Sequence, residues 1–389
     1  MKLVQPHLFG HETAINKAHD SAEQILANPL LRQRLQIRHA EFQVNMADKP
    51  AKVLRERSES SMLLALRALA ADEVDACVSS GNTGALIGLA RHCCGTFEGV
   101  RTVAICAQLP NLNHPSYLLD VGANVDCTAG QLHQFARMGC GLVSSLYPLD
   151  QSHGQKPTVR ALSIGVESGK GNQAVTDAVA LCADDASMDF AGLIEANQLL
   201  MDDCDVVVCD GFTGNIALKA CEGTADYIRR YAHQALSENP RQSSGVEQPS
   251  ERLLQAVQTA RFNGAVLLGL RRTVIKSHGA SDAIAFQAAI EKAIILEQGE
   301  LTQKMMKQLS WYRIVMLRST MNSNKMAFIF PGQGSQQVGM LSAAAKQFPE
   351  VEQTFAQASA ILNYDLWALS QQGPQEQLNL TEITQPLLL

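Results

Sequence analysis

One pattern recurs along this chain: a short apolar strand ends in a polar turn that contains glycine, and a helical pattern follows. The clearest case is Val74–Val78, which leads into a Ser-Ser-Gly-Asn-Thr-Gly turn and then into the helical pattern of Ala85–Arg91. Repeated strand, glycine turn and helix are typical of an α/β fold, in which helices cover both faces of a parallel sheet. The sequence therefore predicts a three-layer α/β/α fold with a mainly parallel sheet.

The same pattern occurs four more times. Strands are expected at Tyr117–Val121, Ala161–Ile164, Asp205–Cys209 and Thr273–Ile275, and further helices at Cys127–Leu142, Ile216–Ala235 and Asp282–Gln298. Turns that follow parallel strands lie at the same edge of a sheet, where ligands bind, so we expect the five turns to form one polar edge. Helix N-termini at that edge present free N–H groups, which favours an anionic ligand such as phosphate.

The composition fits a globular protein of roughly two domains, since the 389 residues are 46% hydrophobic and 18% charged. A net charge of -6 disfavours nucleic-acid binding. No stretch is apolar enough to span a bilayer, and the N-terminus has no apolar signal-peptide core, so we expect a cytoplasmic protein. The ten cysteines form no CxxC pair, and the run His92-Cys93-Cys94 lacks the spaced ligand pairs of a zinc site, so no metal is expected.

Two polar segments interrupt the pattern. Ser237–Arg252 contains two prolines and is expected to be a loop between helices. A second break follows Arg318, and after it Ala327–Phe330 is expected to be a short strand. We therefore expect a domain at 1–318, a linker at 319–325 and a small C-terminal α/β fragment at 326–389. A tail of about sixty residues is expected to lack a complete core of its own.

Five motifs in order carry a family resemblance. They are SSGNTGAL (Ser79–Leu86), LLDVGANVDC (Leu118–Cys127), SIGVESGKG (Ser163–Gly171), DVVVCDGFTGNIALK (Asp205–Lys219) and VIKSHGASDAIAF (Val274–Phe286). Together they resemble the bacterial phosphate acyltransferases of phospholipid synthesis, over about residues 1–315.

The resemblance implies transfer of a long-chain fatty acyl group from acyl carrier protein to inorganic phosphate, which gives acyl phosphate. It also implies a fold related to the isocitrate and isopropylmalate dehydrogenases, a homodimer and no cofactor. Peripheral association with the inner membrane surface, through Ser237–Arg252 and its flanking helices, is implied for the family. A dehydrogenase is disfavoured, because no GxGxxG fingerprint with a downstream acidic residue occurs.

Both ends of the chain depart from that family. Met326–Gln336 (MAFIFPGQGSQ) and Thr381–Leu389 (TEITQPLLL) resemble the start of malonyl-CoA:acyl-carrier-protein transacylase. No GxSxG elbow occurs, so this second activity is expected to be missing. At the front, Val4–Gly10 stands where the family has its second strand, so we expect the first strand and its GGD turn to be absent. The alternative function is therefore a catalytically impaired fusion that only dimerises or binds acyl carrier protein.

Phosphate is itself a nucleophile, so the site is expected to position groups and stabilise charge rather than supply a covalent serine. An anion cradle is expected from Gly81, Asn82, Thr83, Gly84, Asn124 and Asp126. Helix N-capping is the alternative for the Asn82-Thr83 turn and for Asp126.

Catalytic roles are expected for Lys170, Asp210, Asn215, Lys276 and His278. Lys170 is a candidate partner of phosphate or of the thioester carbonyl, and a solvated surface lysine is its alternative. Asp210 is either functional or holds its turn through an Asx bond. His278 is either a general acid toward the departing thiol or a satisfied core histidine.

A basic run precedes the helical pattern near residue 60. Because acyl carrier protein is acidic, Lys52, Arg55 and Arg57 are candidates for docking it. A solvated helix face is the alternative interpretation.

Overall fold

The computed structural model describes residues 4–20, 34–109, 111, 114–147, 156–238, 262–309, 337–346, 350–362, 364–380 and 383. The chain divides into two compact units, Met1–Leu317 and Arg318–Leu389, and each is described by itself. Within the described residues, no helix combines the length and the apolarity that crossing a membrane requires.

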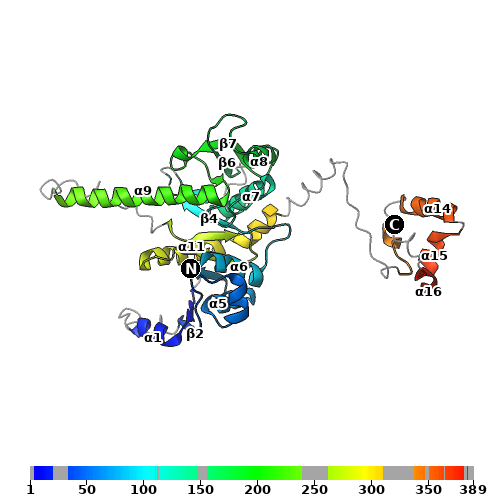
Figure 1. The fold of residues 1–389 in the computed structure, drawn as a ribbon, viewed down its shortest axis with the longest axis horizontal. Helices are drawn as coiled ribbons and strands as arrows, with labels where there is room; N and C mark the ends of the chain where they lie inside the picture. Colours follow the sequence, from blue (N-terminus) through cyan, green and yellow to red (C-terminus); the bar gives the residue numbers. More distant parts are fainter. Residues whose placement is uncertain are drawn as a thin grey trace. The chain divides into compact units, whose positions relative to one another are not determined.

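An eight-stranded sheet forms the centre of the first unit (Figure 1). The strands lie side by side in the order β3 (Ala76–Ser79), β10 (Thr273–Lys276), β9 (Ala265–Leu268), β4 (Ala104–Leu109), β5 (Ser116–Leu119), β8 (Val206–Val208), β6 (Thr158–Ser163) and β7 (Asp189–Glu195). All five strands expected from the glycine-turn pattern are present. Parallel pairs join β3 to β10 and link β5, β8, β6 and β7. The predicted α/β fold with a mainly parallel sheet is confirmed.

Helices pack against both faces of this sheet. One face is covered by α4 (Pro50–Glu56), α5 (Ser61–Ala70), α6 (Thr83–Cys94) and the first part of α9 (Gly211–Glu238), and the other by α7 (Ala129–Leu146), α8 (Gln173–Ala183) and α11 (Ala283–Gln298). Residues 301–309 are also helical, and η2 (Ala196–Gln198) is a short 3-10 helix. Side chains alternate along each strand, so that Leu118 packs in one core while Tyr117 and Leu119 pack in the other.

Two strands that the sequence pattern missed, β4 and β9, reverse the direction of the sheet. β9 is antiparallel to both β10 and β4, and β4 is antiparallel to β5. β3 and β10 therefore run opposite to β5, β8, β6 and β7, and the carboxyl ends of the two groups lie at opposite edges. The expectation that all five turns share one polar edge is wrong. The cause is that β4 and β9 belong to the antiparallel pairs β4–β5 and β9–β10, which a search for strand, turn and helix does not detect.

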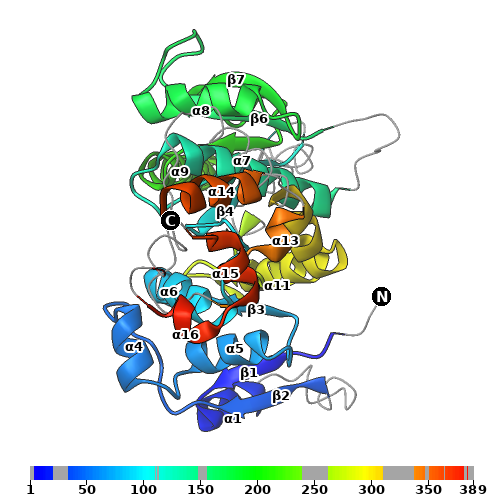
Figure 2. The same ribbon diagram turned by 90° about the vertical axis from the view of Figure 1, so that its right-hand side faces the viewer.

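A small parallel sheet lies apart from the main one. It pairs β1 (His7–Gly10) with β2 (Gln36–His39), and α1 (Glu12–Asp20) follows β1. Figure 2 shows this sheet at one end of the first unit, with β6 and β7 at the other. An ion pair between Arg38 and Glu73 joins the small sheet to the segment after α5.

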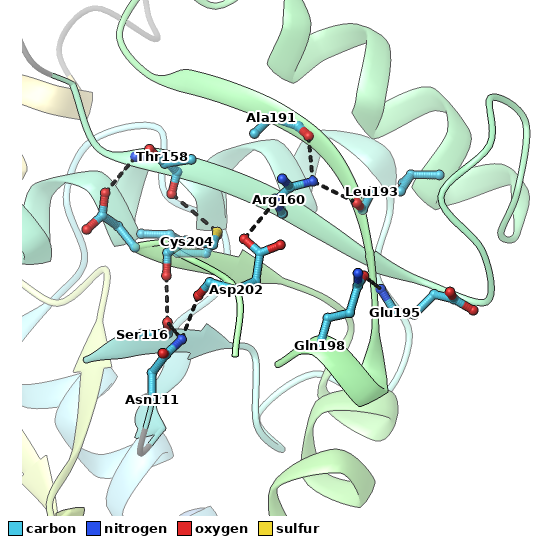
Figure 3. Close-up of polar contacts among 12 residues, drawn as sticks. Asn111, Ser116, Thr158, Arg160, Ala191, Leu193, Glu195, Gln198, Asp202 and Cys204 are labelled. Carbon is cyan, nitrogen blue, oxygen red and sulfur yellow. Dashed lines mark hydrogen bonds and ion pairs between the residues drawn. The ribbon is translucent and has the colours of Figure 1, made fainter. Parts of the chain in front are cut away.

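A network of hydrogen bonds and an ion pair stabilises the edge of the main sheet formed by β6 and β7 (Figure 3). The pairing of β6 and β7 shifts register beside Arg160, and the Arg160 side chain donates to the carbonyls of Ala191 at 2.8 Å and Leu193 at 3.1 Å. The same guanidinium forms an ion pair with Asp202 at 3.2 Å. Arg160 thus holds β7 and the segment after it against β6, whose carboxyl end leads into the turn of Lys170.

Described residues of the second unit form α13 (Ser342–Ala345), α14 (Glu350–Leu362), α15 (Leu366–Gln372) and α16 (Gln375–Leu378). Phe355, Leu366 and Leu378 are buried together, and the Phe355 and Trp367 rings meet edge-on at 5.0 Å. This cluster has only three buried members within the described residues, so the expectation that the tail lacks a complete core of its own stays a prediction. The strand expected at Ala327–Phe330 lies outside the described residues, as does most of the loop expected at Ser237–Arg252.

Candidate functional site

Lys276 marks the first polar edge, at the carboxyl ends of β3 and β10. It lies opposite Ser79 in the parallel ladder, and its half-buried Nζ donates to the carbonyls of Ser80 at 3.3 Å and of Ser277. Burial lowers the pKa of Lys276, and the positive charge of Lys219 lowers it further. We call this the Lys276 edge; it holds a cation that has no carboxylate partner among the described residues.

The first turn of α6 lies at the same edge. Asn82 is the N-cap of α6, and its Oδ1 accepts from the Ala85 N–H at 3.0 Å. Its Nδ2 lies within hydrogen-bonding distance of three backbone carbonyls, those of Asn45, Met46 and Asp48. The cap, one of the two interpretations of this turn, is therefore present, and the Asn82 side chain has no donor left for an anion.

The remaining donors of this turn differ in whether they have an acceptor. The Gly81 N–H donates to Ser79 Oγ at 3.2 Å. The N–H groups of Thr83 and Gly84 have no acceptor among the described residues, and neither does the Thr83 hydroxyl. Because they open a twelve-residue helix, these groups favour an anion. Of the residues predicted to bind phosphate in this turn, Thr83 and Gly84 are the two whose donors are available.

His278 follows Lys276 by two residues and is exposed. Its backbone N–H donates to Asn263 Oδ1 at 2.9 Å, and the ring Nδ1 accepts from the Ala280 N–H at 3.2 Å. A satisfied core histidine, one of the two interpretations of this residue, does not fit an exposed ring. The structure thus brings His278, Lys276 and the start of α6 together at one edge.

The opposite edge is organised by Asp120, which the sequence analysis did not single out. The carboxylate is fully buried and accepts from the N–H groups of Ile105, Gly122, Ala123 and Asn124 and from the Asn124 side chain. Burial raises the pKa of Asp120, although these hydrogen bonds act in the other direction. Its position directly after an apolar strand and before a Gly-Ala-Asn turn was the signal for this role. We call this the Asp120 edge.

Residues predicted from two turns meet at the Asp120 edge. The Asn124 side chain donates to Val103 O at 2.9 Å and to Asp120 Oδ2 at 2.8 Å, and the Asn124 carbonyl accepts from the Gly211 N–H at 2.7 Å. Asp126 is exposed and does not cap α7, because Thr128 and Gln131 form the capping box there. Asn124 therefore holds the turn together, while Asp126 remains at the surface.

The start of α9 belongs to the same edge. Asp210 accepts from the Thr213 N–H at 2.8 Å and from the Thr213 hydroxyl at 2.9 Å, so the structural interpretation of Asp210 is present. Asn215 is exposed and lies close to Gly122, and its side chain makes no hydrogen bond with the described residues. Lys170 is also exposed, at the end of β6, and forms no ion pair with them. Catalytic roles for these three residues stay predictions.

α9 connects the two edges. It starts beside the Asp120 turn, packs against β5 and β4, and carries Lys219 one helical turn after Asn215. Lys219 is close enough to lower the pKa of Lys276, and it forms an ion pair with Glu222 at 2.6 Å. The sequence analysis missed Lys219, because a lysine inside a helical pattern gives no turn signal.

The three basic residues near position 55 differ in their exposure to solvent. Lys52 and Arg55 are exposed on α4. Arg57 is mostly buried, where it pairs with Asp48 at 3.0 Å and donates to Gln43 O at 2.6 Å. Arg57 therefore supports the loop that Asn82 also holds. Lys52 and Arg55 are the two exposed charges of the run, and Lys52 lies 3.9 Å from Asp48 in a loose ion pair.

The chemistry available here is electrostatic. The Lys276 edge offers a lysine ammonium, two free amides, a hydroxyl and an imidazole, which suit an anion. The thiols at the Asp120 edge are poor nucleophiles: burial and the charges of Asp120 and Asp210 raise the pKa of Cys127 to about 12, and burial raises that of Cys209 well above its ordinary value. No cluster of three metal-ligating side chains occurs within the described part of the chain.

Comparisons with known proteins identify a family and several relatives. The family described as "Fatty acid synthesis protein" matches residues 8–304. A phosphate acyltransferase of Cellvibrio japonicus is 39% identical over 309 residues, which cover 78% of this chain and 88% of that protein. A phosphate acyltransferase of Saccharophagus degradans is 41% identical over 267 residues, covering 67% and 76%. EutD phosphotransacetylase from Staphylococcus aureus superposes with a TM-score of 0.47 at 14% identity, covering 76% and 87%.

Proposed function

The chain belongs to the fatty acid synthesis protein family, and we propose that it transfers a long-chain fatty acyl group from acyl carrier protein to inorganic phosphate. It is an acyltransferase, as its relatives at about 40% identity are. The product would be acyl phosphate, which serves phospholipid synthesis.

One observation carries this proposal: Lys276 lies beside the free N-terminus of α6. Its ammonium group is bound to the Ser80 carbonyl at 3.3 Å, three residues before Thr83, whose N–H has no acceptor among the described residues. A helix N-terminus and a lysine that has no carboxylate partner among the described residues both favour a doubly charged anion such as hydrogen phosphate. Lys219 adds a second positive charge within electrostatic range.

The proposed reaction needs no covalent enzyme intermediate. A phosphate oxygen attacks the thioester carbonyl carbon, a C–O bond forms, and the C–S bond breaks. The proton of hydrogen phosphate ends on the departing sulfur, so that acyl phosphate and the free thiol of acyl carrier protein are formed. Lys276 and the amides of Thr83 and Gly84 hold the phosphate, and His278 supplies a further polar group to the thioester.

Acyl carrier protein is the proposed acyl donor, and α4 is its proposed docking element. Lys52 and Arg55 are exposed there, and α4 packs on α6 next to the phosphate-binding turn. We expect the double exchange Lys52→Glu and Arg55→Glu to raise the KM for acyl carrier protein and to leave the KM for phosphate unchanged. An unchanged KM for acyl carrier protein would remove α4 from the docking surface.

A homodimer is proposed, with α9 at its interface. Phe212, Ile216, Tyr227 and Tyr231 are 54–68% exposed and lie on one stripe of this helix. The helix extends well beyond the sheet (Figure 1). Tyr231→Glu is expected to shift the protein to monomer in analytical ultracentrifugation, whereas Arg229→Glu, on the opposite side of α9, is expected to leave it dimeric. The same sedimentation coefficient for both variants would argue against this interface.

We further propose that the enzyme works in the cytoplasm, attached peripherally to the inner membrane surface through the segment that follows α9. Co-flotation with anionic vesicles tests this attachment, and a protein that remains at the bottom of the gradient would exclude it.

The C-terminal fragment is proposed to be the remnant of a malonyl transacylase. Its support is the PGQGSQ sequence of Pro331–Gln336 together with the separate small core around Phe355. We expect no malonyl transfer to acyl carrier protein from malonyl-CoA, since the chain has no GxSxG elbow. Measurable malonyl transfer would contradict this.

The acyl-transfer proposal is tested by the release of free acyl carrier protein from palmitoyl-acyl carrier protein, with and without phosphate. Phosphate-dependent release, with acyl phosphate trapped by hydroxylamine, is the expected result. No release from folded protein would instead favour the alternative, a catalytically impaired fusion that only dimerises or binds acyl carrier protein.

A further inference from the structure

Asn263 has a densely bonded side chain at the Lys276 edge. Its Nδ2 lies 2.7 Å from Ser277 Oγ, 3.2 Å from Ser281 Oγ and 2.7 Å from Ala285 O. Its Oδ1 accepts from the His278 N–H at 2.9 Å. One side chain therefore binds the turn after β10 at three points and the first turn of α11 at a fourth.

The local chain geometry explains why Asn263 reaches this turn. Gly264, the next residue, has φ +97, and a Cβ there would lie 2.9 Å from the Cα of Ala289. Glycine thus lets α11 pack directly on the start of β9. That close approach puts Asn263 beside the loop from Ser277 to Asp282, which joins β10 to α11.

The same loop fixes the imidazole of His278. The Ala280 N–H donates to Nδ1 at 3.2 Å, and the Ser281 hydroxyl donates to the His278 carbonyl at 2.7 Å. A nitrogen that accepts from a backbone N–H carries no proton, so the neutral ring carries its proton on Nε2. The backbone around the ring is held by Asn263 through the His278 N–H and through Ser281.

We propose that Asn263 is a positioning residue that keeps His278 in its Nε2–H tautomer, and that this N–H donates a hydrogen bond to the thioester carbonyl oxygen. The inference rests on the proposed function and specifies the role of His278 in it. The imidazole transfers no proton, because a neutral ring that lost its Nε2 proton would become an anion. It stabilises the negative charge that develops on oxygen while phosphate attacks, and the phosphate proton goes to sulfur.

The tautomer is tested independently of activity. The full chain is labelled with [15N]histidine, and the His278 signals are assigned by their loss in His278→Gln. In the wild type we expect an unprotonated Nδ1 and a protonated Nε2. In Asn263→Ala both nitrogens are expected to move toward the averaged values of a free imidazole. Ser281→Ala, a milder change, is expected to move them in the same direction.

The matched control is Asn111→Ala. Asn111 also ties a loop to a strand, through Ser116 Oγ at 3.1 Å and Asp202 O at 2.6 Å, but it belongs to the Arg160 network shown in Figure 3. This variant is expected to leave the His278 signals unchanged. Unchanged signals in Asn263→Ala would overturn the proposal, and so would an equal shift in Asn111→Ala.

Kinetics supply the second readout. Asn263→Ala is expected to lower kcat about 10- to 100-fold, the cost of a displaced catalytic group, while the KM for phosphate changes less than about threefold. A loss confined to KM, or an equal loss in Asn111→Ala, would refute the positioning role. If the wild type releases no acyl carrier protein in response to phosphate, the proposed function fails, and the nitrogen signals still decide the role of Asn263.

Discussion

At the scale of single residues, the site depends on positive charges held close together. Burial lowers the pKa of Lys276, and the positive charge of Lys219 lowers it further. A phosphate dianion near both lysines would offset this repulsion. The positive charges of Lys276 and Lys219 would therefore both contribute to binding an anion. Removing the charge of Lys219 should then weaken phosphate binding.

Lys219→Gln is expected to raise the KM for phosphate about three- to fivefold, the size of effect for one charge at an exposed position. Lys219 is 48% exposed and paired with Glu222. The control is Arg229→Gln on the same helix, since Arg229 is 43% exposed and paired with Asp226 at 2.7 Å. Steady-state kinetics at varied phosphate distinguish the two. Equal KM values in both variants would remove Lys219 from the phosphate site.

Asn82 provides a second prediction, because its side chain caps α6 and also holds the loop from Asn45 to Asp48. Asn82→Ala is expected to lower the free energy of unfolding by about 2–3 kcal/mol, the sum of a lost cap and unsatisfied buried carbonyls. Asn82→Asp keeps the cap but places a carboxylate oxygen against the carbonyls of Asn45, Met46 and Asp48, so a loss at least as large is expected. Urea denaturation measures both. A variant of full stability with a large increase in phosphate KM would instead indicate direct phosphate binding by this side chain.

At the scale of elements, the approach of α9 to the Asp120 turn is the tightest contact of the site. A Cβ on Gly214 would lie 1.9 Å from the Asp120 carbonyl oxygen, which cannot move without breaking the turn. Gly223, farther along α9, has nothing within 4 Å of such a Cβ. Gly214 and Gly223 of the same helix are thus under different constraints.

Gly214→Ala is expected to lower the free energy of unfolding by about 3 kcal/mol or more, because backbone has to shift. Gly223→Ala is expected to raise it by about 1 kcal/mol through helix propensity alone. Thermal and chemical unfolding of the pair checks both signs. If Gly214→Ala proved as stable as the wild type, α9 would not pack against the Asp120 turn as described.

A buried ion network joins α7 to the segment before β7. Asp185 accepts from His133 at 2.7 Å and from the Ser187 N–H at 2.9 Å, and it pairs with Arg137 at 3.4 Å. Burial alone would raise the pKa of Asp185. The hydrogen bonds and the Arg137 charge outweigh burial, so this pKa lies below its ordinary value.

A carboxyl group with a lowered folded-state pKa contributes stability that is present above its unfolded-state pKa of about 3.9 and is lost as pH falls toward the folded-state value. Asp185→Asn is therefore expected to cost about 3–5 kcal/mol of unfolding free energy at pH 7 and progressively less below about pH 4. Denaturation across this pH range measures the difference. A difference that stays constant down to pH 3 would show that the charge of Asp185 does not contribute.

Some strands of the main sheet could be predicted from the sequence and others could not. Glycine turns after apolar runs located β3, β5, β6, β8 and β10, because each of these strands leads into a turn of distinctive composition. β4 and β9 were not predicted, because neither is followed by a glycine turn and a helix. Their antiparallel direction depends on hydrogen-bond pairing between distant segments, which local composition does not encode. The same limitation affects the candidate site. The sequence predicted Lys276 and the turn before α6 as site residues, but it did not predict that they lie at the opposite edge of the sheet from the Asp120 turn.

At the scale of the whole molecule, family membership and geometry point to one reaction. The family model spans residues 8–304, within the first unit, and the Lys276 edge and α9 lie in the same stretch. The docking role proposed for Lys52 and Arg55 could be predicted from the sequence only as a cluster of positive charge, because docking geometry involves a second molecule.

The central claim is that phosphate itself attacks the thioester, and incubation with palmitoyl-acyl carrier protein and [18O]phosphate tests it most directly. Mass spectrometry of the intact acyl phosphate, before any trapping reagent is added, is expected to show 18O at every phosphoryl oxygen, including the one that bridges to the acyl carbon, with release of acyl carrier protein only when phosphate is present. Free fatty acid formed at the same rate without phosphate, or no release from folded protein, would contradict the account.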